Sequence, residues 1–597
     1  MEASAAALAW MMVAVVSFDA QEAAAPPDVV DHGRSDYVLV VAEEAGPATR
    51  YAAGELQRWL KEMTGAELPI VADTEPPRPH EILVGPSKRL YDYGIALRLG
   101  PLGQEGYVLR TVGERLLVAG GEPRGTLYAV YGLLGDHLGC RWFTPEVSRI
   151  PRTERLPLPQ LDESRIPALE YRDVFIHECH DGDWAARNRL NSSHARLEAR
   201  HGGRVEYAGF VHTFNDLVPV EKYFETHPEY FSEIDGKRER EQTQLCCTNE
   251  EVVRIVTEEV RRRMREHPEA MVFSVSQNDW FRYCQCGPCA ALAAAEGSQM
   301  APVLQLVNRV AEAVEEEFPD KAVDTLAYQW TRRPPKTLRP RRNVIVRLCS
   351  IECCFAHPLA SCDSPQNQAF VADLEGWALI CDRLWVWDYV TDFAHYLRPF
   401  PNLRVLDANI RLLAENHVTG IFEEGNYSSP QGEFQALRGY VLARCLWDPA
   451  CNALEARDEF LAAVYGPAAG PIRRYLELLH FGAASQHLGI YDGVDAPYLG
   501  QDWQDAADKL FDAAETAAAG APELLARVRA ARLPVDYVAV ERARAGGAAA
   551  DAALAQRVRR FFAGARECGL TAVAEWNGAL EAYEQRVRAI PGLARDR

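Results

Sequence analysis

The stretch Met271-Val-Phe-Ser-Val-Ser-Gln-Asn-Asp-Trp-Phe-Arg-Tyr-Cys-Gln-Cys-Gly-Pro-Cys289 contains an apolar run, a polar cluster and three cysteines, in that order. The run Met271–Val275 predicts a buried strand, and a long amphipathic helix is predicted to follow the cysteines. Strand, polar tip, loop and helix form the repeating unit of an α/β barrel. Such barrels carry their chemistry at the C-terminal ends of their strands. The stretch therefore predicts a barrel with Asn278 and Asp279 at its functional centre.

Similar units recur along the chain between residues 165 and 450. Eight segments have strand character, namely Tyr171–His177, Tyr207–His212, Thr243–Cys247, Met271–Val275, Ala322–Tyr328, Asn343–Leu348, Leu384–Trp387 and Val418–Phe422. Amphipathic helices are predicted between several of them. Eight units over roughly 280 residues have the size of a (β/α)8 TIM barrel. An open doubly wound sheet is the alternative, and the count and the length favour the barrel.

Two further domains are predicted around this barrel, which gives the α/β fold class overall. Residues 36–155 alternate strands and helices and predict a small α/β domain, and the Pro-rich run Pro151–Pro167 predicts a linker. Residues 451–597 show helical spacing throughout and no strand signals. They predict an α-helical domain in which no site residue is evident.

The net charge and the N-terminal segment limit the classes of partner and indicate where the protein is located. The 597 residues carry a net charge of −21, which argues against nucleic acid and anionic membranes as partners. The apolar run Ala5–Phe18 is too short to span a bilayer and predicts a signal peptide over residues 1–25, although Glu2 stands where a basic residue is usual. A misassigned start or a non-signal tail is the alternative. Secretion or periplasmic location is therefore expected, and no other segment is apolar enough to cross a membrane.

Acidic and aromatic residues gather just after the predicted strands, where hydrolysis of a glycosidic bond would need them. Such hydrolysis requires a carboxylic acid that protonates the leaving oxygen, and a second group that attacks or stabilises the anomeric carbon. The candidates are Asn278, Asp279 and Glu424 for catalysis, and His212, Trp280, Tyr328, Trp330, Trp387, Asp388, Tyr389 and Glu423 for binding substrate. Because successive residues of a strand point to opposite faces, only one of Glu423 and Glu424 is expected to face the site.

The cysteines Cys284, Cys286 and Cys289 begin five residues after Asp279. A fourth thiolate from Cys246 or Cys247 would complete a tetrahedral set suited to zinc. In an exported protein, disulfides are the more usual fate of such cysteines. Because no second C-x2-C pair is present, we interpret the cluster as disulfides or packed thiols that clamp the Asp279 loop, and we expect no metal and no cofactor.

Two parts of the chain resemble known families. Residues 36–155 resemble the N-terminal domain shared by β-hexosaminidases and α-glucuronidases, in the runs Gln104-Glu-Gly-Tyr-Val-Leu109, Val118-Ala-Gly-Gly121 and Arg124-Gly-Thr-Leu-Tyr-Ala-Val-Tyr-Gly-Leu-Leu134. The barrel resembles a family formerly of unknown function that is associated with endo-β-N-acetylglucosaminidase activity. The runs that carry this second resemblance include Phe210-Val-His-Thr-Phe214, His227-Pro-Glu-Tyr-Phe231, Ser276-Gln-Asn-Asp279, Tyr283-Cys-Gln-Cys-Gly-Pro-Cys289, Trp387-Asp-Tyr389 and Trp447-Asp-Pro449.

The second resemblance implies a retaining hydrolase of N-acetylglucosamine-containing glycans or glycoproteins, assisted by the 2-acetamido group of the substrate. In the related hexosaminidases an Asp-Glu pair follows the fourth strand. By position, Asn278 would hold the acetamido group and Asp279 would be the acid, with Glu424 as the rival acid. Tyr389 would hydrogen-bond the acetamido group, and Trp280, Trp330 and Trp387 would stack against sugars.

Two other functions stay open. One is an α-glucuronidase-like inverting hydrolase, which would need two separated carboxylates and basic residues such as Arg332 and Arg333 for the uronate. The other is a carbohydrate-binding protein that has the aromatic residues but no catalytic acid. The Asn-Asp pair, in place of Asp-Glu, keeps that second possibility open.

Overall fold

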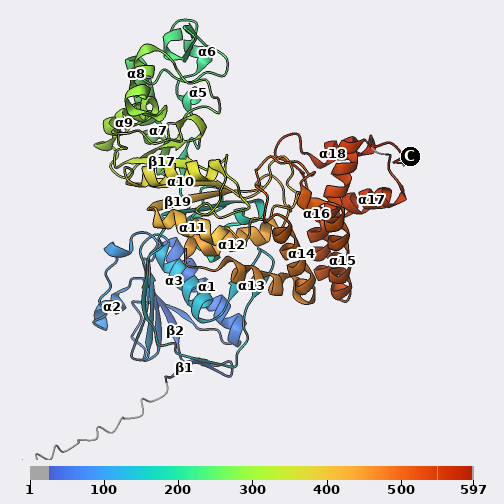
Figure 1. The fold of residues 1–597 in the computed structure, drawn as a ribbon. Helices are drawn as coiled ribbons and strands as arrows, with labels where there is room; N and C mark the ends of the chain where they lie inside the picture. Colours follow the sequence, from blue (N-terminus) through green and yellow to red (C-terminus); the bar gives the residue numbers. More distant parts are fainter. Residues whose placement is uncertain (1–25, 548, 594–597) are drawn as a thin grey trace, which may run out of the picture.

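The computed structural model describes residues 26–547 and 549–593, so the predicted signal peptide lies outside the described residues. Figure 1 shows three regions: an N-terminal α/β domain, a central barrel-like domain with a helical lobe above it, and a C-terminal group of helices to one side. No helix in the described part of the chain is long and apolar enough to cross a membrane.

The N-terminal domain is built on a six-stranded sheet with the order β10-β5-β6-β4-β2-β3. Its strands are β2 (Val38–Val41), β3 (Ile70–Ala72), β4 (Glu81–Val84), β5 (Tyr107–Val112), β6 (Arg115–Gly120) and β10 (Asp162–Arg165). Helices α1 (Pro47–Thr64) and α3 (Gly125–Gly132) pack on it; Leu56 and Trp59 of α1 are buried at helical spacing. The short helix α2 (Lys88–Asp92) follows β4.

The segment that was predicted to be a linker belongs to this domain. Within it, β9 (Arg155–Pro157) pairs with β1 (Asp28–Asp31), and β10 pairs antiparallel with β5. The prolines flank these short strands at the edges of their sheets, where a missing N–H is tolerated. The segment that was predicted to be a linker therefore contains two strands that pair with strands of the N-terminal domain.

The central domain contains a curled parallel sheet of seven strands with the order β11-β19-β18-β17-β16-β15-β12. The strands are β11 (Tyr171–Phe175), β12 (Tyr207–Ala208), β15 (Val272–Ser274), β16 (Ala322–Ala327), β17 (Val344–Cys349), β18 (Leu384–Tyr389) and β19 (Val418–Glu424). Seven of the eight predicted strands therefore form, and they lie in one parallel sheet. The alternation of strands with helices is that of an α/β barrel, but no ladder joins β11 to β12 in the described chain.

The third predicted strand, Thr243–Cys247, does not join this sheet. Its backbone pairs instead with the segment just before it: the Ser232 N–H donates to the Gln244 carbonyl (3.0 Å) and the Cys246 N–H donates to the Tyr230 carbonyl (2.8 Å). These local bonds satisfy the backbone groups that a barrel strand would have offered to its neighbours. The strand β12 is also short, because Gly209 follows it in the left-handed region at φ 77°.

The sheet has an inner and an outer face that alternate residue by residue. One face buries a cluster of large side chains at the centre of the curl, which contains Tyr171, Val272, Ala322, Ile345, Trp385 and Phe422. The intervening residues pack into the main hydrophobic core beneath the helices. We call the face that carries Trp385 and Phe422 the inner face.

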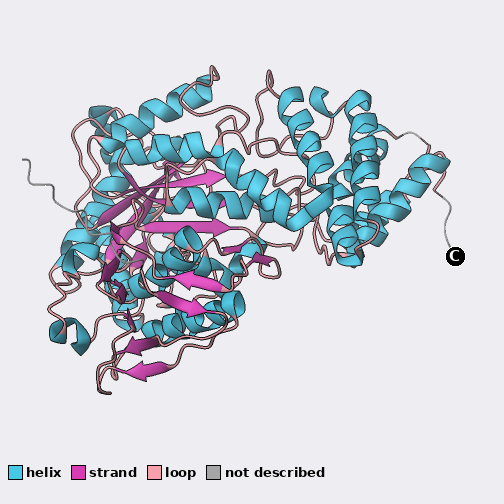
Figure 2. Ribbon diagram, turned by 90° about the horizontal axis from the view of Figure 1, so that it is seen from below, coloured by secondary structure: helices cyan, strands magenta, loops and turns pink. Residues whose placement is uncertain are grey.

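Helices cover the outer face, as Figure 2 shows from another side. They are α7 (Glu250–Glu266), α9 (Met300–Glu315), α10 (Pro365–Ala378), α11 (Leu406–Glu415) and α12 (Gln435–Trp447). Helix α8 (Gly287–Glu296) packs against α9. Asn249 caps α7, because its side chain accepts hydrogen bonds from the Glu251 and Val252 N–H groups. The short helices α4 (Gly182–Arg187), α5 (Phe214–Leu217) and α6 (Val220–Tyr223) lie in the loops after β11 and β12.

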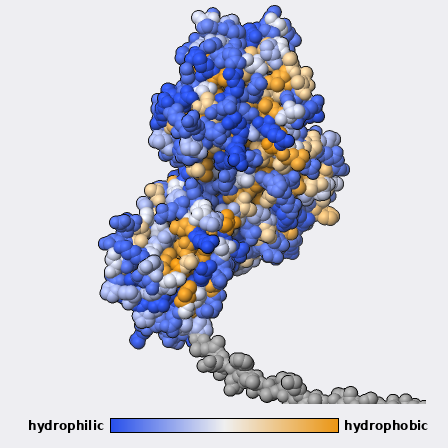
Figure 3. All heavy atoms as spheres, turned by 90° about the vertical axis from the view of Figure 1, so that its left-hand side faces the viewer, coloured by the Kyte–Doolittle hydropathy of each residue, from blue (hydrophilic) through white to orange (hydrophobic). Residues whose placement is uncertain are grey.

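The C-terminal region is helical, as predicted. It consists of α13 (Ala453–Tyr465), α14 (Ala469–Gly482), α15 (Gln501–Ala518), α16 (Pro522–Gly546), α17 (Ala552–Glu567) and α18 (Leu580–Arg588). Two of its loops reach the barrel: the Phe393 N–H donates to the Ile490 carbonyl (2.8 Å), and the Glu575 N–H donates to the Phe393 carbonyl (2.9 Å). The surface seen in Figure 3 is mostly hydrophilic, with smaller hydrophobic areas between.

Candidate active site

The ends of β18 and β19 place Glu424 and its neighbours on the inner face. Phe422 belongs to the inner cluster, so Glu424, two residues later, points to the same side. In the parallel register Tyr389 lies beside Glu424, and Trp387 lies beside Phe422. The Trp387 Nε1–H donates a hydrogen bond to the Glu424 Oε2 at 2.9 Å.

Glu424 has a buried carboxyl group whose surroundings favour the neutral form. It is 9% exposed, and burial raises its pKa to about 8, an effect that the hydrogen bond from Trp387 partly offsets and the charge of Glu575 reinforces. At neutral pH this carboxyl group is therefore mostly protonated, which is the state required of a general acid.

Asp388 and Glu423 lie on the outer face, opposite these residues. They are paired in the register of β18 and β19, and both are buried. Ser350 donates a hydrogen bond to Asp388. Burial raises the pKa of Asp388 to about 6 and, together with the charge of Asp388, raises the pKa of Glu423 well above its ordinary value. Their side chains therefore point away from Glu424, to the other face of the sheet.

Asn278 holds together three segments of backbone. Its Oδ1 accepts from the Asn215 N–H (3.1 Å), and its Nδ2 donates to the Thr243 carbonyl (2.9 Å). Gln244 fixes the loop further, since its side chain accepts from the Asn278 N–H (2.9 Å) and donates to the Asn278 (2.8 Å) and Trp280 (2.6 Å) carbonyls. The loop is thus anchored on both sides of Asp279, whose side chain remains exposed.

The charges of Asp279 and Glu424 both act on the same tyrosine, Tyr491. Burial, and next the charges of Glu575, Glu424 and Asp279, raise the pKa of Tyr491 to about 12. Burial and the Asp279 carboxylate likewise raise the pKa of Tyr328. Carboxyl groups from β19, from the loop after β15 and from the C-terminal region therefore act electrostatically on one tyrosine. We call the set Asp279, Tyr328, Trp387, Tyr389, Glu424, Tyr491 and Glu575 the strand-end cluster.

The remaining predicted residues lie around the Asp279 loop. The Trp330 Nε1–H donates to the Trp280 carbonyl (3.0 Å), and the Trp280 side chain is 42% exposed. The His212 Nδ1–H donates to the Gln277 carbonyl (2.8 Å), and the His212 ring lies 6.0 Å from the Tyr328 ring, centroid to centroid. These three residues thus line the side of the cluster formed by Asp279 and Tyr328.

The sequence analysis missed residues of the C-terminal region. Glu575 accepts a hydrogen bond from the Tyr427 hydroxyl (2.9 Å), and burial raises its pKa. Trp576 stacks on Tyr491 with ring centroids 5.9 Å apart, and both rings are more than half exposed. No signal in the sequence pointed to these residues, because they lie in loops that are distant in sequence and return to the barrel.

An aspartate–histidine pair on the inner face was also missed. Asp173 of β11 lies 3.1 Å from the Nδ1 of His194, and the Tyr171 hydroxyl donates to the same carboxylate oxygen (2.8 Å). The His194 ring packs 4.2 Å from Phe175 and 5.5 Å from Phe422, centroid to centroid, so it lies close to the end of β19. The sequence signal was an acidic residue inside an apolar strand, which a helix cap does not explain.

Beneath the strand-end cluster, a buried ion pair fills the centre of the sheet. The Arg347 Nη2 lies 3.1 Å from the Asp324 Oδ2, and both side chains are fully buried. The guanidinium also lies over the rings of Phe210 (4.7 Å) and Trp387 (5.7 Å). This arrangement closes the interior of the barrel below Trp387 and supports that indole from underneath.

A separate cavity of about 310 Å³ lies between the loop after β11 and the C-terminal helices. Glu178 and Phe434 are among its lining residues, and burial raises the pKa of Glu178 to about 7. None of the predicted site residues lines it, and the Glu178 carboxylate is already bonded to the Gln431 N–H (2.9 Å). The candidate site is therefore the strand-end cluster.

Residues 142–477 match the family described as "Domain of unknown function (DUF4838)", which is more than half of the chain. The chain belongs to this family. Residues 30–133 match the family described as "Glycosyl hydrolase family 67 N-terminus", in agreement with the resemblance of the N-terminal domain to that of α-glucuronidases. A comparison with curated proteins gave no match.

Two solved structures of glycoside hydrolases are similar to this chain. A family GH115 4-O-methyl-α-glucuronidase with specificity for decorated arabinogalactans matches at a TM-score of 0.55 and 13% identity, over 94% of this chain and 80% of that one. A family 89 glycoside hydrolase from Clostridium perfringens matches at a TM-score of 0.46 and 11% identity, over 87% and 65%. The first of these shows that the DUF4838 chain shares its fold with a glycosidase.

Proposed function

We propose that this protein is a glycoside hydrolase that cleaves N-acetylglucosamine-containing glycans, with Glu424 as the general acid. The observation that carries the proposal is the Glu424 carboxyl group, which lies at the C-terminal end of a barrel strand and is bonded to Trp387, and whose burial raises its pKa to about 8. Strand ends are where α/β barrels place their catalytic groups. The proposal reverses the order expected from sequence, in which Asp279 was the first choice for the acid.

The second group of the reaction is supplied by the substrate in this proposal. The oxygen of the 2-acetamido group attacks the anomeric carbon while Glu424 protonates the leaving oxygen, and an oxazolinium ion forms. Water then attacks the same carbon and gives up a proton to the Glu424 carboxylate, which restores the acid. Asp279, exposed at the anchored loop, is assigned to accept a hydrogen bond from the acetamido N–H and to stabilise the positive charge.

Other residues bind and position the sugar. The hydroxyl groups of Tyr328 and Tyr389 are neutral, since burial raises the pKa of both, and they can donate to the acetamido oxygen. Asn278 has a positioning role, because its amide is bonded to the backbone of two other segments. Asp388 and Glu423 receive no role in contacting the substrate.

The inverting alternative is less well supported at one of the two arginines predicted for it. Arg332, the predicted partner of a uronate, is bonded to Asp373 (2.8 Å) and to Glu352 (3.0 Å). Its charge is therefore already balanced within the protein. A binding protein without catalysis would have no need for a buried, protonated carboxyl group beside the strand ends, since isolating such a group from water costs free energy.

The test compares the wild type with Glu424→Gln, Asp279→Asn and Glu423→Gln on three substrates. These are an aryl N-acetyl-β-glucosaminide, a complex N-glycoprotein and a glucuronoxylan fragment. Glu423→Gln is the matched control, because it changes another buried carboxyl group on the opposite face of the same strand. We expect cleavage of at least one of the first two substrates, which Glu424→Gln reduces and Glu423→Gln spares.

Cleavage of the glucuronoxylan fragment alone would favour the inverting α-glucuronidase. Binding of the glycans without cleavage of any would favour the carbohydrate-binding protein. A loss in Asp279→Asn that exceeds the loss in Glu424→Gln on substrates with poor leaving groups would return the role of the acid to Asp279.

A further inference from the structure

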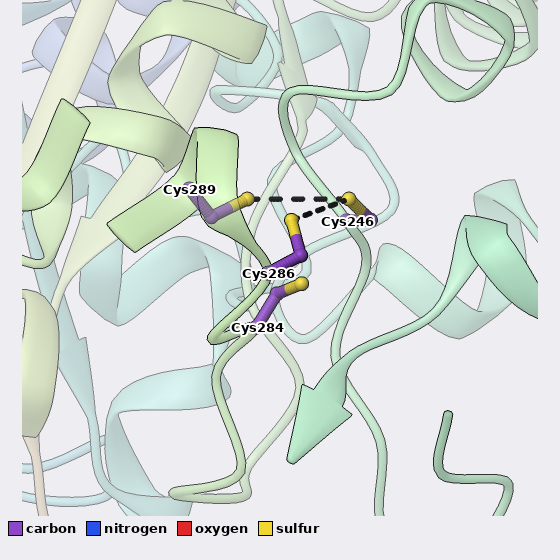
Figure 4. A group of neighbouring side chains, drawn as sticks. All are labelled: Cys246, Cys284, Cys286 and Cys289. Carbon is purple, nitrogen blue, oxygen red and sulfur yellow. Dashed lines mark hydrogen bonds between the residues drawn. The ribbon is translucent and has the colours of Figure 1, made fainter. Parts of the chain in front are cut away.

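The cysteines that follow the Asp279 loop converge with one from the segment Thr243–Cys247. The four sulfur atoms of Cys246, Cys284, Cys286 and Cys289 all lie within 4.8 Å of one another. Figure 4 shows that they point toward a common centre from the start of α8, the loop before it and the segment opposite. Cys247, the other candidate for the fourth position, points away into the main core.

The distances fit a shared metal ion. The Cys246 sulfur lies 3.6 Å from that of Cys286 and 4.0 Å from that of Cys289. Zinc bound to four thiolates has Zn–S bonds of about 2.3 Å, so a tetrahedral set places its sulfur atoms about 3.8 Å apart. All 15 cysteines of the chain are free thiols in the structure, so the disulfides considered from sequence do not form there.

Packing alone does not account for the cluster. The four side chains are buried, yet they form a hydrophobic group of their own that contains no other apolar residue. Four small thiols bury little apolar surface and supply little packing free energy. A shared zinc ion would instead explain why they converge on one point.

The surroundings of the sulfur atoms suit bound thiolates. The Glu233 N–H donates to the Cys284 sulfur (3.4 Å), and the Arg238 Nη1 lies 3.8 Å from the same atom. The Thr248 hydroxyl lies 3.1 Å from the Cys289 sulfur. Four thiolates around a Zn²⁺ ion carry a net charge of −2. Hydrogen-bond donors beside the sulfur atoms reduce the free-energy cost of burying that charge.

We propose that Cys246, Cys284, Cys286 and Cys289 form a structural zinc site. All four positions of the tetrahedron are taken by protein sulfur, which leaves none for water or substrate, so the site is structural rather than catalytic. Each cysteine loses its proton when it binds the ion. The site joins the segment that carries Gln244 to the loop that carries Asp279, and Gln244 holds the backbone on both sides of Asp279.

The experiment measures zinc per chain in the intact protein, purified under reducing conditions from cells supplied with zinc. Cys246→Ser/Cys286→Ser is compared with the wild type and with Cys568→Ser, a control whose cysteine lies outside both groups of possible ligands. A second group, Cys354, His357, Cys362 and His487, can hold an ion of its own, so the difference between the proteins is the quantity measured. We expect the double variant to lose one zinc per chain and the control to lose none.

A second measurement covers the case in which the double variant fails to fold. Cobalt exchanged into the wild type should give the intense visible bands of a tetrahedral thiolate site, and Cys286→His, which keeps a ligand, should retain the ion with shifted bands. Zinc removal with a chelator should speed hydrogen exchange at Asn278–Arg282. Equal zinc in the double variant and the wild type would overturn the proposal, as would a wild type without zinc whose four cysteines are joined by disulfides. None of these measurements depends on glycosidase activity.

Discussion

At the scale of single residues, the chemistry depends on how Glu424 is kept protonated. Burial raises its pKa and the Trp387 N–H lowers it, because an N–H donor stabilises the carboxylate more than the acid. A general acid acts only while it holds its proton. We therefore expect kcat/KM to fall as the pH rises through about 8, the pKa of Glu424.

Trp387→Phe tests this balance directly. Phenylalanine keeps the ring but removes the N–H, so the pKa of Glu424 should rise further and the alkaline limb of the pH profile should shift to higher pH. Trp385→Phe is the matched control, because that indole N–H donates to Glu170 (2.8 Å) and not to Glu424. An alkaline limb that does not shift in Trp387→Phe, or that shifts equally in Trp385→Phe, would contradict the assignment of that limb to Glu424.

The same pKa shift has a consequence for folding stability. A carboxyl group whose folded pKa is raised contributes stability that is present below its unfolded pKa and is lost as the pH rises through the folded value. For Glu424 the loss should run from about pH 4.5 to about pH 8. Urea unfolding across this range should show that the free energy of unfolding decreases less with pH for Glu424→Gln than for the wild type. An equal dependence on pH in the two proteins would contradict the raised pKa.

At the scale of elements, two loops of the C-terminal region complete the site. Tyr491 and Trp576 stack on each other at the edge of the strand-end cluster and expose their faces to solvent. Exposed aromatic faces at this position are suited to stacking on a sugar ring that lies beyond the cleaved bond. We therefore expect this region to contribute to binding, although its helices lie to one side of the barrel (Figure 1).

Trp576→Ala should weaken binding of extended substrates more than that of small ones. Loss of one aromatic stacking contact costs on the order of 1 kcal/mol, so KM for a glycoprotein should rise roughly 2- to 10-fold while kcat/KM for an aryl glycoside changes little. Phe481→Ala is the control, since that ring is 80% exposed at the end of α14. Equal effects on both substrates would argue against a sugar-binding role.

Most strands of the barrel could be predicted, because their apolar bodies are local sequence features. Thr243–Cys247 has the same pattern but pairs with Tyr230 and Ser232, and sequence does not reveal which partner a strand takes. The alternation of side chains along a strand predicted that only one of Glu423 and Glu424 faces the site. It did not by itself indicate which of the two does. The contributions of Glu575 and His194 depend on contacts between distant segments, and no spacing rule could anticipate them.

At the scale of the whole molecule, buried charges join the N-terminal domain to the barrel. Glu105 of the N-terminal domain lies 2.7 Å from Arg172 of β11 and 2.6 Å from Arg124. Burial alone would favour the neutral acid, but the two guanidinium groups outweigh it and keep the pKa of Glu105 below its ordinary value. The two domains are therefore expected to unfold together.

Glu105→Gln should destabilise the protein by about 3–5 kcal/mol, because it leaves two buried guanidinium groups without their partner. Glu105 has a lowered pKa, so its contribution is present above the unfolded pKa and is lost as the pH falls through the folded value. The variant should therefore approach the wild type in acid. Thermal unfolding at neutral and acidic pH measures this, with Glu62→Gln, at an exposed site of α1, as the control. A variant as stable as the control at neutral pH would contradict the role of the pair.

The measurement that tests the central claim most directly is the dependence of kcat/KM on the leaving group, in the wild type and in Glu424→Gln. Aryl N-acetyl-β-glucosaminides with poor leaving groups need a proton from the acid, whereas those with very good leaving groups do not. The account predicts that Glu424→Gln loses about 10²- to 10⁴-fold on the poor leaving groups and little on the good ones. Equal losses on both would contradict the assignment of Glu424 as the general acid.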